Sequence, residues 1–369
     1  MAQAFHGGGI AQAAQEFGRP ADEFLDFSSN LNGLAPAIPP ELWLRWLAEV
    51  RRYPEADSQM LRQRVADTYE VDAQFLLPTS GAIEALYLVA RLFIGRKVAI
   101  IEPSFSDYAR AFDAAGCQVE RLTLQPADWA RPLPELADIL AGFDVVVFGN
   151  PNNPTGKFDS LANVRTLLAM PQLRGKAWVI DEAFIEFVPD HRRETLLPLL
   201  AEYPSLLLIR SLTKSWCVPG LRLGFVATAN TGWLSQLSAW QAPWALNGIA
   251  HAWATTFLTP ENWRLLQEAL AGLDSVRGAL VAMLVRIPGL RIYPSAANFL
   301  LMELLDPRLD ATALYRELGR RGILIRVCDS FHGLPQGRFI RIAVKSPEAN
   351  ERLQAALGQA CLQLSGGRE

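Results

Sequence analysis

Two cations interrupt an apolar stretch near the middle of the chain, where residues 211–225 read SLTKSWCVPGLRLGF. Lys214 lies between two hydroxyl residues and precedes a Trp-Cys-Val-Pro run, and Arg222 stands eight residues later in what reads as a strand. Most lysines are solvated surface residues. A lysine withdrawn from water becomes a nucleophile that can bond to a carbonyl group. The other motifs decide between these two interpretations.

A carboxylate follows another apolar run. Asp181 follows the apolar part of the run KAWVIDEA. Glu182 is the next residue, and Glu186 stands five residues after Asp181. Because ligands of open α/β sheets bind beyond the carboxyl ends of the strands, Asp181 is a candidate ligand-binding acid. For Glu182 and Glu186 a solvated loop position is the reasonable expectation.

The segment 149–157, GNPNNPTGK, is rich in amides and prolines. Its composition excludes helix and strand, which indicates that an amide such as Asn153 is needed at a fixed place. The segment imitates the end of a nucleotide-binding loop. However, Gly149 is too far from Gly156, and Phe158 stands where Ser or Thr would hold magnesium. We therefore reject a nucleoside triphosphatase.

Two further strand ends carry binding candidates. Ser80, Gly81 and Ala82 precede a helical run, and the free N–H groups of such a turn can bind an anion. Tyr108 follows the run KVAIIEP and could stack on a flat ligand. Taken alone, an ordinary helix start and a core aromatic are the commoner interpretations.

Together these parts predict one ligand, pyridoxal 5'-phosphate (PLP), whose bound form is anionic at one end and cationic at a ring nitrogen. Lys214 would bond to its aldehyde, Asp181 would pair with the ring nitrogen, and Asn153 would donate to the phenolic oxygen. The predicted phosphate ligands are Ser80, Gly81, Ala82, Ser211 and Arg222. The two buried cations are then explained by an anionic cofactor.

The elements that position these residues follow a βαβ pattern. KVAIIEP, DVVVFGN, KAWVIDEA and SLLLIRS are continuous apolar runs, typical of parallel strands with helices on both faces. Beyond residue 260 we expect one long helix over 262–286 and a smaller α+β domain. The predicted organisation is an α/β fold with an arm and part of the small domain in 1–45, a large cofactor-binding domain in 46–255, and the small domain in 256–369.

Bulk properties narrow the class of protein. The net charge is −3, with no block of Lys or Arg, so we expect no nucleic-acid partner. Four scattered cysteines and four dispersed histidines predict neither a disulfide framework nor a metal site, and suit a reducing cytoplasm. The start, MAQAFHGGGI, lacks the pattern of a secretory signal, and no run is apolar enough to span a membrane.

The order of the motifs SGAIE, PNNPTG, DEAF and SLTKSWCVPGLRLG resembles that of fold type I, aspartate-aminotransferase-like PLP enzymes over nearly the whole chain. The segment RYPEAD is similar to the Tyr-Pro segment of the histidinol-phosphate aminotransferase branch. The resemblance implies that Tyr53 reaches the cofactor phosphate of a neighbouring subunit, and hence that the protein is a homodimer.

Two branches of this family compete: histidinol-phosphate aminotransferases and the threonine-phosphate decarboxylases of cobalamin biosynthesis. The arm His6-Gly7-Gly8, the stretch LDFSSNLNGL with Asn30, and QAPWALNGIA resemble the decarboxylases. Phe184 stands where the aminotransferases usually have a tyrosine. Gly9 departs from the decarboxylase pattern, which usually has Asn there.

The resemblance to the decarboxylases implies that the substrate is L-threonine O-3-phosphate. It also implies that the reaction is decarboxylation of this substrate to (R)-1-aminopropan-2-ol O-phosphate. Histidinol-phosphate transamination is the alternative. Arg326 and Arg341 break the apolar alternation of two strands, and a buried arginine is costly unless it is paired. A substrate carboxylate or phosphate would pair with them. The predicted substrate-binding residues are His6, Gly7, Gly8, Asn30, Asn153, Arg326 and Arg341.

Overall fold

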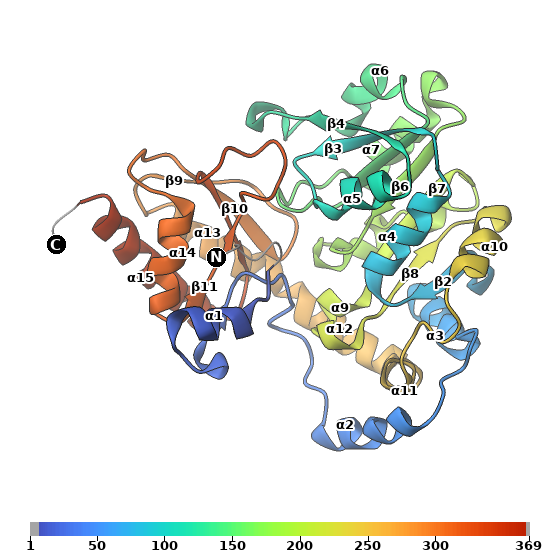
Figure 1. The fold of residues 1–369 in the computed structure, drawn as a ribbon, viewed down its shortest axis with the longest axis horizontal. Helices are drawn as coiled ribbons and strands as arrows, with labels where there is room; N and C mark the ends of the chain where they lie inside the picture. Colours follow the sequence, from blue (N-terminus) through green and yellow to red (C-terminus); the bar gives the residue numbers. More distant parts are fainter. Residues whose placement is uncertain (1–6, 367–369) are drawn as a thin grey trace.

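The computed structural model describes residues 7–366 and contains a seven-stranded sheet, which lies in the right-hand part of Figure 1. The strand order is β2-β8-β7-β6-β5-β3-β4. The strands span Leu76–Thr79 (β2), Lys97–Glu102 (β3), Gln118–Thr123 (β4), Val145–Gly149 (β5), Ala177–Asp181 (β6), Leu206–Ser211 (β7) and Gly224–Ala227 (β8). Strand β8 runs antiparallel to both of its neighbours, and the other pairs are parallel. This confirms the predicted α/β class with a mostly parallel sheet.

The sheet is buried on both faces, as its continuous apolar runs predict. Alternate residues of β7 enter two different hydrophobic clusters: Leu206 and Leu208 join one, and Leu207 and Ile209 join the other. This is the two-residue period of a strand with apolar neighbours on each side. The helices α4 (Gly81–Arg91), α5 (Asp107–Ala114) and α10 (Thr231–Trp240) supply residues to the second cluster, and α3 (Gln59–Tyr69), α7 (Leu161–Ala169) and α11 (Gly248–Phe257) supply the first.

A smaller sheet forms a second lobe, at the left of Figure 1. Its antiparallel strands lie in the order β12-β13-β10-β9, with bounds Leu290–Ile292 (β9), Phe299–Leu304 (β10), Arg326–Val327 (β12) and Phe339–Ala343 (β13). A separate pair joins β1 (Leu25–Asp26) to β11 (Ile323–Leu324) in parallel, so the N-terminal segment attaches to this lobe. The lobe also contains α1 (Ile10–Phe17), α14 (Ala311–Arg320) and α15 (Pro347–Leu364). The exact domain bounds remain a prediction.

Two local predictions were wrong. The single helix expected over 262–286 is a pair, α12 (Pro260–Ala271) and α13 (Leu273–Leu284), separated at Gly272, the residue type that favours helix least after proline. Arg222 does not interrupt a strand, because it lies in a left-handed conformation two residues before β8 begins.

The remaining helices are short or peripheral. They are α2 (Pro40–Leu47), α6 (Ala137–Leu140), α8 (His191–Glu194) and α9 (Leu212–Ser215). In Figure 1, α12 and α13 run from the side of the large sheet toward the small one, and α2 lies at the lower edge. Within the described range, no helix combines the length and the apolarity needed to cross a membrane.

Candidate active site

A cavity of about 530 Å³ lies where the carboxyl ends of the large sheet meet the small lobe. Both lobes line it, and the N-terminal segment contributes to its wall. Of the residues predicted from the sequence, the lining includes Gly7, Asn30, Ala82, Tyr108, Asn153, Asp181, Ser211, Lys214, Arg222, Arg326 and Arg341. Phe184 lines it as well. The structure therefore brings together residues that lie up to 334 positions apart in the chain (7 to 341).

Lys214 is carried by α9, directly after β7, and its side chain is partly exposed to the cavity. Burial lowers its pKa to about 8, and the nearby cations Arg341 and Arg222 lower it in the same direction. The N-terminal segment holds the backbone here: Asn32 donates from its backbone N to Lys214 O at 3.0 Å and from its side chain to Ser215 O at 2.9 Å. Asn32 was not singled out from the sequence. The backbone that carries Lys214 is thus held in place. With a pKa of about 8, a fraction of the Lys214 side chains is neutral at physiological pH.

Asp181 ends β6 and faces the same cavity. Its Oδ1 accepts a 2.8 Å hydrogen bond from Ala183 N, and its Oδ2 accepts one of 2.8 Å from the Tyr108 hydroxyl. Burial raises the pKa of Asp181, while these two hydrogen bonds and the charges of Lys214 and Arg210 oppose the rise. Both carboxylate oxygens are therefore oriented by donors of the protein itself.

An anion cradle lies at the start of α4. Gly81 has φ +78°, and a Cβ there would lie 2.4 Å from the Arg222 guanidinium, so glycine leaves the space that this cation occupies. Ser80 is the N-cap of α4, and Ala82 lines the cavity. Ser211 ends β7 beside them, with its hydroxyl 2.9 Å from that of Thr213. A cation, a helix N-terminus and a hydroxyl suit a phosphate group.

Arg341 joins three parts of the molecule. Its guanidinium donates to Asn153 Oδ1 on the large lobe and to Ser28 O of the N-terminal segment, the latter at 2.9 Å. Burial lowers the pKa of Arg341 to about 10, so the group remains a cation at neutral pH. Arg326 lies opposite Arg341 in the β12–β13 register and donates to Ser330 Oγ. The two guanidiniums form one cationic wall.

The N-terminal arm reaches this wall. Gly8 N donates to Ser28 Oγ at 2.9 Å, and a Cβ on Gly7 would lie 2.1 Å from Ser28 O, so only glycine fits there. Asn30 is 4 % exposed, and its Oδ1 has no hydrogen-bond partner among residues 7–366. A buried acceptor of this kind is available to a ligand. His6 lies outside the described residues.

Tyr53 does not line the cavity. Its side chain is 84 % exposed and lies beside Trp244, with ring centroids 5.1 Å apart. In the part of the chain described, no cluster of three or more His, Cys, Asp or Glu side chains is arranged to hold a metal ion.

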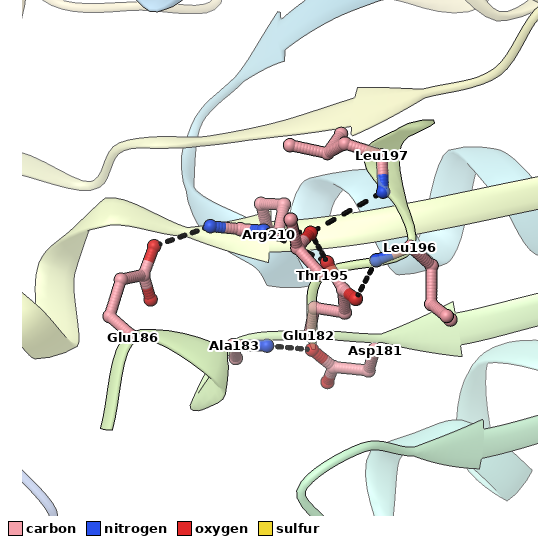
Figure 2. Close-up of polar contacts among 8 residues, drawn as sticks. All are labelled: Asp181, Glu182, Ala183, Glu186, Thr195, Leu196, Leu197 and Arg210. Carbon is pink, nitrogen blue, oxygen red and sulfur yellow. Dashed lines mark hydrogen bonds and ion pairs between the residues drawn. The ribbon is translucent and has the colours of Figure 1, made fainter. Parts of the chain in front are cut away.

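A buried charge cluster lies next to Asp181, as Figure 2 shows. Arg210 on β7 donates to Glu182 Oε2 at 2.8 Å and to Glu186 Oε1 at 2.6 Å. Glu182 and Glu186 are 0 % and 1 % exposed, so the expectation of solvated loop acids was wrong. Burial acts to lower the pKa of Arg210, but Glu186 and Glu182 outweigh it and raise that pKa well above its ordinary value. An arginine inside the apolar run SLLLIRS indicates that some buried acid must pair with it, but not which one.

The donor set fits PLP: an amine of lowered pKa, an oriented carboxylate and a phosphate cradle surround one cavity. The fold and the site thus define a PLP-dependent enzyme of fold type I. The family model for aminotransferase class I and II matches residues 27–357, and the chain belongs to this family.

Named relatives come from both branches that the sequence suggested. The chain is 33 % identical over 355 residues to a threonine-phosphate decarboxylase of Salmonella typhimurium, covering 95 % of each chain. It is 32 % identical over 321 residues to a histidinol-phosphate aminotransferase of Symbiobacterium thermophilum, covering 85 % of this chain and 84 % of the other. The fold is similar, with a TM-score of 0.81 and 21 % identity, to that of histidinol-phosphate aminotransferase from Sinorhizobium meliloti in complex with PLP, covering 96 % and 95 % of the two chains. PLP is the cofactor of this protein.

The charge cluster leads to a stability prediction. Arg210→Met leaves Glu182 and Glu186 buried without their cation, and removal of one partner from such a cluster typically costs about 3–5 kcal/mol. We expect a large fall in the free energy of unfolding, measured by urea denaturation of the apoprotein. Arg308→Met is the matched control, since its pair with Asp306 lies at the surface and its loss should change nothing measurable. An equal effect of both substitutions would contradict the prediction.

Proposed function

We propose that this enzyme decarboxylates L-threonine O-3-phosphate to (R)-1-aminopropan-2-ol O-phosphate and CO2, a reaction of cobalamin biosynthesis. The observation that carries the proposal is the cationic wall of Arg326 and Arg341, which shares one cavity with Lys214. Threonine phosphate carries two anionic groups, a carboxylate and a phosphate, on either side of its amine. Two cations beside the reactive lysine match that charge pattern.

Bound PLP supplies an electron sink for the electron pair left on the substrate Cα when a bond there breaks. The chain supplies the orientation. Lys214 would hold the cofactor and return a proton to Cα, a task that suits an amine whose pKa lies near 8. The Asp181 carboxylate would pair with the ring nitrogen of the cofactor and keep that nitrogen protonated. The cofactor phosphate would be held by Ser80, Gly81, Ala82, Ser211 and Arg222.

Asn153 would donate to the phenolic oxygen of the cofactor. Its Oδ1 accepts from Arg341, which leaves the Nδ2 hydrogens as the free face of the amide. Phe184 lines the cavity without a hydroxyl, and its ring packs edge-on against Phe299 at 5.0 Å. Asn153 is then the main protein partner of that oxygen. The ring of Tyr108 would cover the ring of the cofactor.

The substrate would be held by Arg326, Arg341, Asn30 and the Gly7-Gly8 arm, with His6, in the orientation in which its Cα–carboxylate bond, and not its Cα–H bond, breaks. CO2 would leave and the electron pair of that bond would pass to the cofactor. The phosphate has its own part, because an anion bound far from the reacting bond supplies binding energy for orientation. An aminotransferase would present the Cα–H bond with the same parts.

The proposal includes a homodimer with shared sites. Tyr53 does not line the cavity of its own subunit. It lies in a stretch that exposes the large apolar side chains of Leu44, Leu47, Val50 and Met60. Trp244, beside Tyr53, is 50 % exposed. A surface of this kind suits contact with a second copy, whose cofactor phosphate the Tyr53 hydroxyl would reach. We place the enzyme in the cytoplasm.

We expect borohydride reduction of the holoenzyme, followed by peptide mapping, to locate the pyridoxyl group on Lys214. The rate at which the apoprotein captures PLP should rise with pH through about 8, because only the neutral amine attacks the aldehyde. A label on Lys176, whose amine is held by Ala141 O and Phe143 O, or on Lys157 would refute the assignment.

The reaction is tested with carboxyl-labelled L-threonine O-3-phosphate. We expect release of labelled CO2, with little transfer of the amino group to a keto acid. Free L-threonine should lose kcat as well as affinity, since it lacks the remote anion. Absence of labelled CO2 together with efficient transamination between histidinol phosphate and 2-oxoglutarate would assign the enzyme to the other branch.

Shared sites are tested by complementation. Homodimers of Lys214→Ala or of Tyr53→Ala should each be impaired. In a mixed dimer, one site combines Lys214 from one subunit with Tyr53 from the other, so we expect that site to recover wild-type PLP affinity and activity. A mixed dimer no better than its parents, or a monomer by analytical ultracentrifugation, would refute the shared site.

A further inference from the structure

Tyr108 makes a contact that covering a flat ligand does not require. Its hydroxyl donates a 2.8 Å hydrogen bond to Asp181 Oδ2, and the side chain is 2 % exposed. Phenylalanine would present the same ring. The hydroxyl therefore acts on the carboxylate, at the oxygen that Ala183 N leaves free.

We propose that the Tyr108 hydroxyl is a positioning group for Asp181, which fixes the carboxylate and keeps it an anion toward the ring nitrogen of the cofactor. This inference rests on the role of Asp181 proposed above. Hydrogen bonds to an ionised oxygen are about twice as strong as those between neutral groups, so one donor matters in a buried site.

The neighbouring strand leaves room for this hydroxyl. Gly149 ends β5, opposite Asp181 in the β5–β6 register. A Cβ at Gly149 would lie 3.0 Å from the Tyr108 hydroxyl oxygen, while the φ of Gly149 is not in the left-handed region. The backbone conformation does not require glycine here, but a side chain would crowd the Tyr108 hydroxyl and, at 3.3 and 3.4 Å, Asn152 Cα and Pro151 O. The hydroxyl is the atom nearest to that position.

The surrounding charges set the sign of the effect. Lys214 and Arg210 face Asp181, Arg222 and Arg341 face Lys214, and Glu102 faces Tyr108. Burial raises the pKa of Asp181, and the hydrogen bond from Tyr108 opposes that rise. Without the hydroxyl the pKa of Asp181 rises further, so a smaller fraction is ionised at any given pH. The ring nitrogen then loses its proton more readily.

The test compares Tyr108→Phe with wild type, Asp181→Asn and Tyr293→Phe. Tyr293 donates to Glu303 Oε2 at the same distance, 2.8 Å, but belongs to the small lobe, so it is the matched control. The readouts are the PLP dissociation constant of the apoprotein, the pH titration of the bound cofactor's absorption, and the acid limb of kcat.

For Tyr108→Phe we expect about tenfold weaker PLP binding and an acid limb moved to higher pH. The absorption midpoint should also rise, because an unprotonated ring nitrogen no longer repels the proton on the lysine–cofactor linkage. Asp181→Asn should shift the midpoint in the same direction and further. Gly149→Ala, which crowds the hydroxyl, should give a smaller shift of the absorption midpoint. This variant replaces Tyr108→Phe in the test if Tyr108→Phe does not fold.

Burial raises the pKa of Glu102 to about 7, so its titration must be separated from that of Asp181. In a Glu102→Gln background the shift caused by Tyr108→Phe should persist. Wild-type binding and midpoint in Tyr108→Phe, beside a shifted Asp181→Asn, would overturn this inference and leave the role of Asp181 intact. An unshifted Asp181→Asn would overturn both, and an equal shift in Tyr293→Phe would show a non-specific effect and overturn the inference alone.

Discussion

The ion pair between Arg210 and Glu182 ties together the two strand ends on which the site is built. Asp181 lies opposite Ile209 in the parallel register of β6 and β7, so Glu182 and Arg210 are the next residues on each strand. Their contact is 2.8 Å long, and because side chains alternate along a strand, Glu182 and Arg210 point away from the face on which Asp181 and Ser211 line the cavity. Because Lys214 follows Arg210 by four residues, this pair sets where the amine stands relative to the carboxylate.

The pair also explains why the cluster needs a second acid and a hydroxyl. A buried arginine with one partner leaves most of its donors unsatisfied, which costs free energy. Arg210 donates from one terminal nitrogen to Glu186. From the other it donates to Glu182 and, at 3.1 Å, to Thr195 Oγ. Glu182 further accepts from Leu196 N, so the loop after α8 is fixed to the same strand ends. Both oxygens of Glu182 and both terminal nitrogens of Arg210 have partners, whereas Arg210 Nε and Glu186 Oε2 have none among residues 7–366. The cluster is therefore held by its ion pairs without complete hydrogen bonding.

Much of this arrangement could be predicted from the sequence. Continuous apolar runs predicted the central strands, and polar residues at the ends of those runs predicted the cavity. Glu182 and Glu186 could not be placed, because their burial depends on Arg210, which lies on another strand. Asn32 lies far from Lys214 and Ser215 in the sequence and contacts them only in the folded chain, and the Gly7 arm was placed at the site by the family resemblance and not by a local pattern. Such contacts leave no local pattern, whereas a strand or a helix does.

Arg341 connects the residues that the proposed function assigns to the cofactor with those that it assigns to the substrate. It lies in the small lobe, holds the amide of Asn153 on the large lobe, and holds the N-terminal segment through Ser28 O. Under the proposed roles, a substrate anion that took one of these hydrogen bonds would change both the amide that faces the cofactor and the hold on the segment that carries Asn30. Arg341 would then couple the binding of the substrate anion to the position of Asn153 and of the N-terminal segment, because one guanidinium holds both.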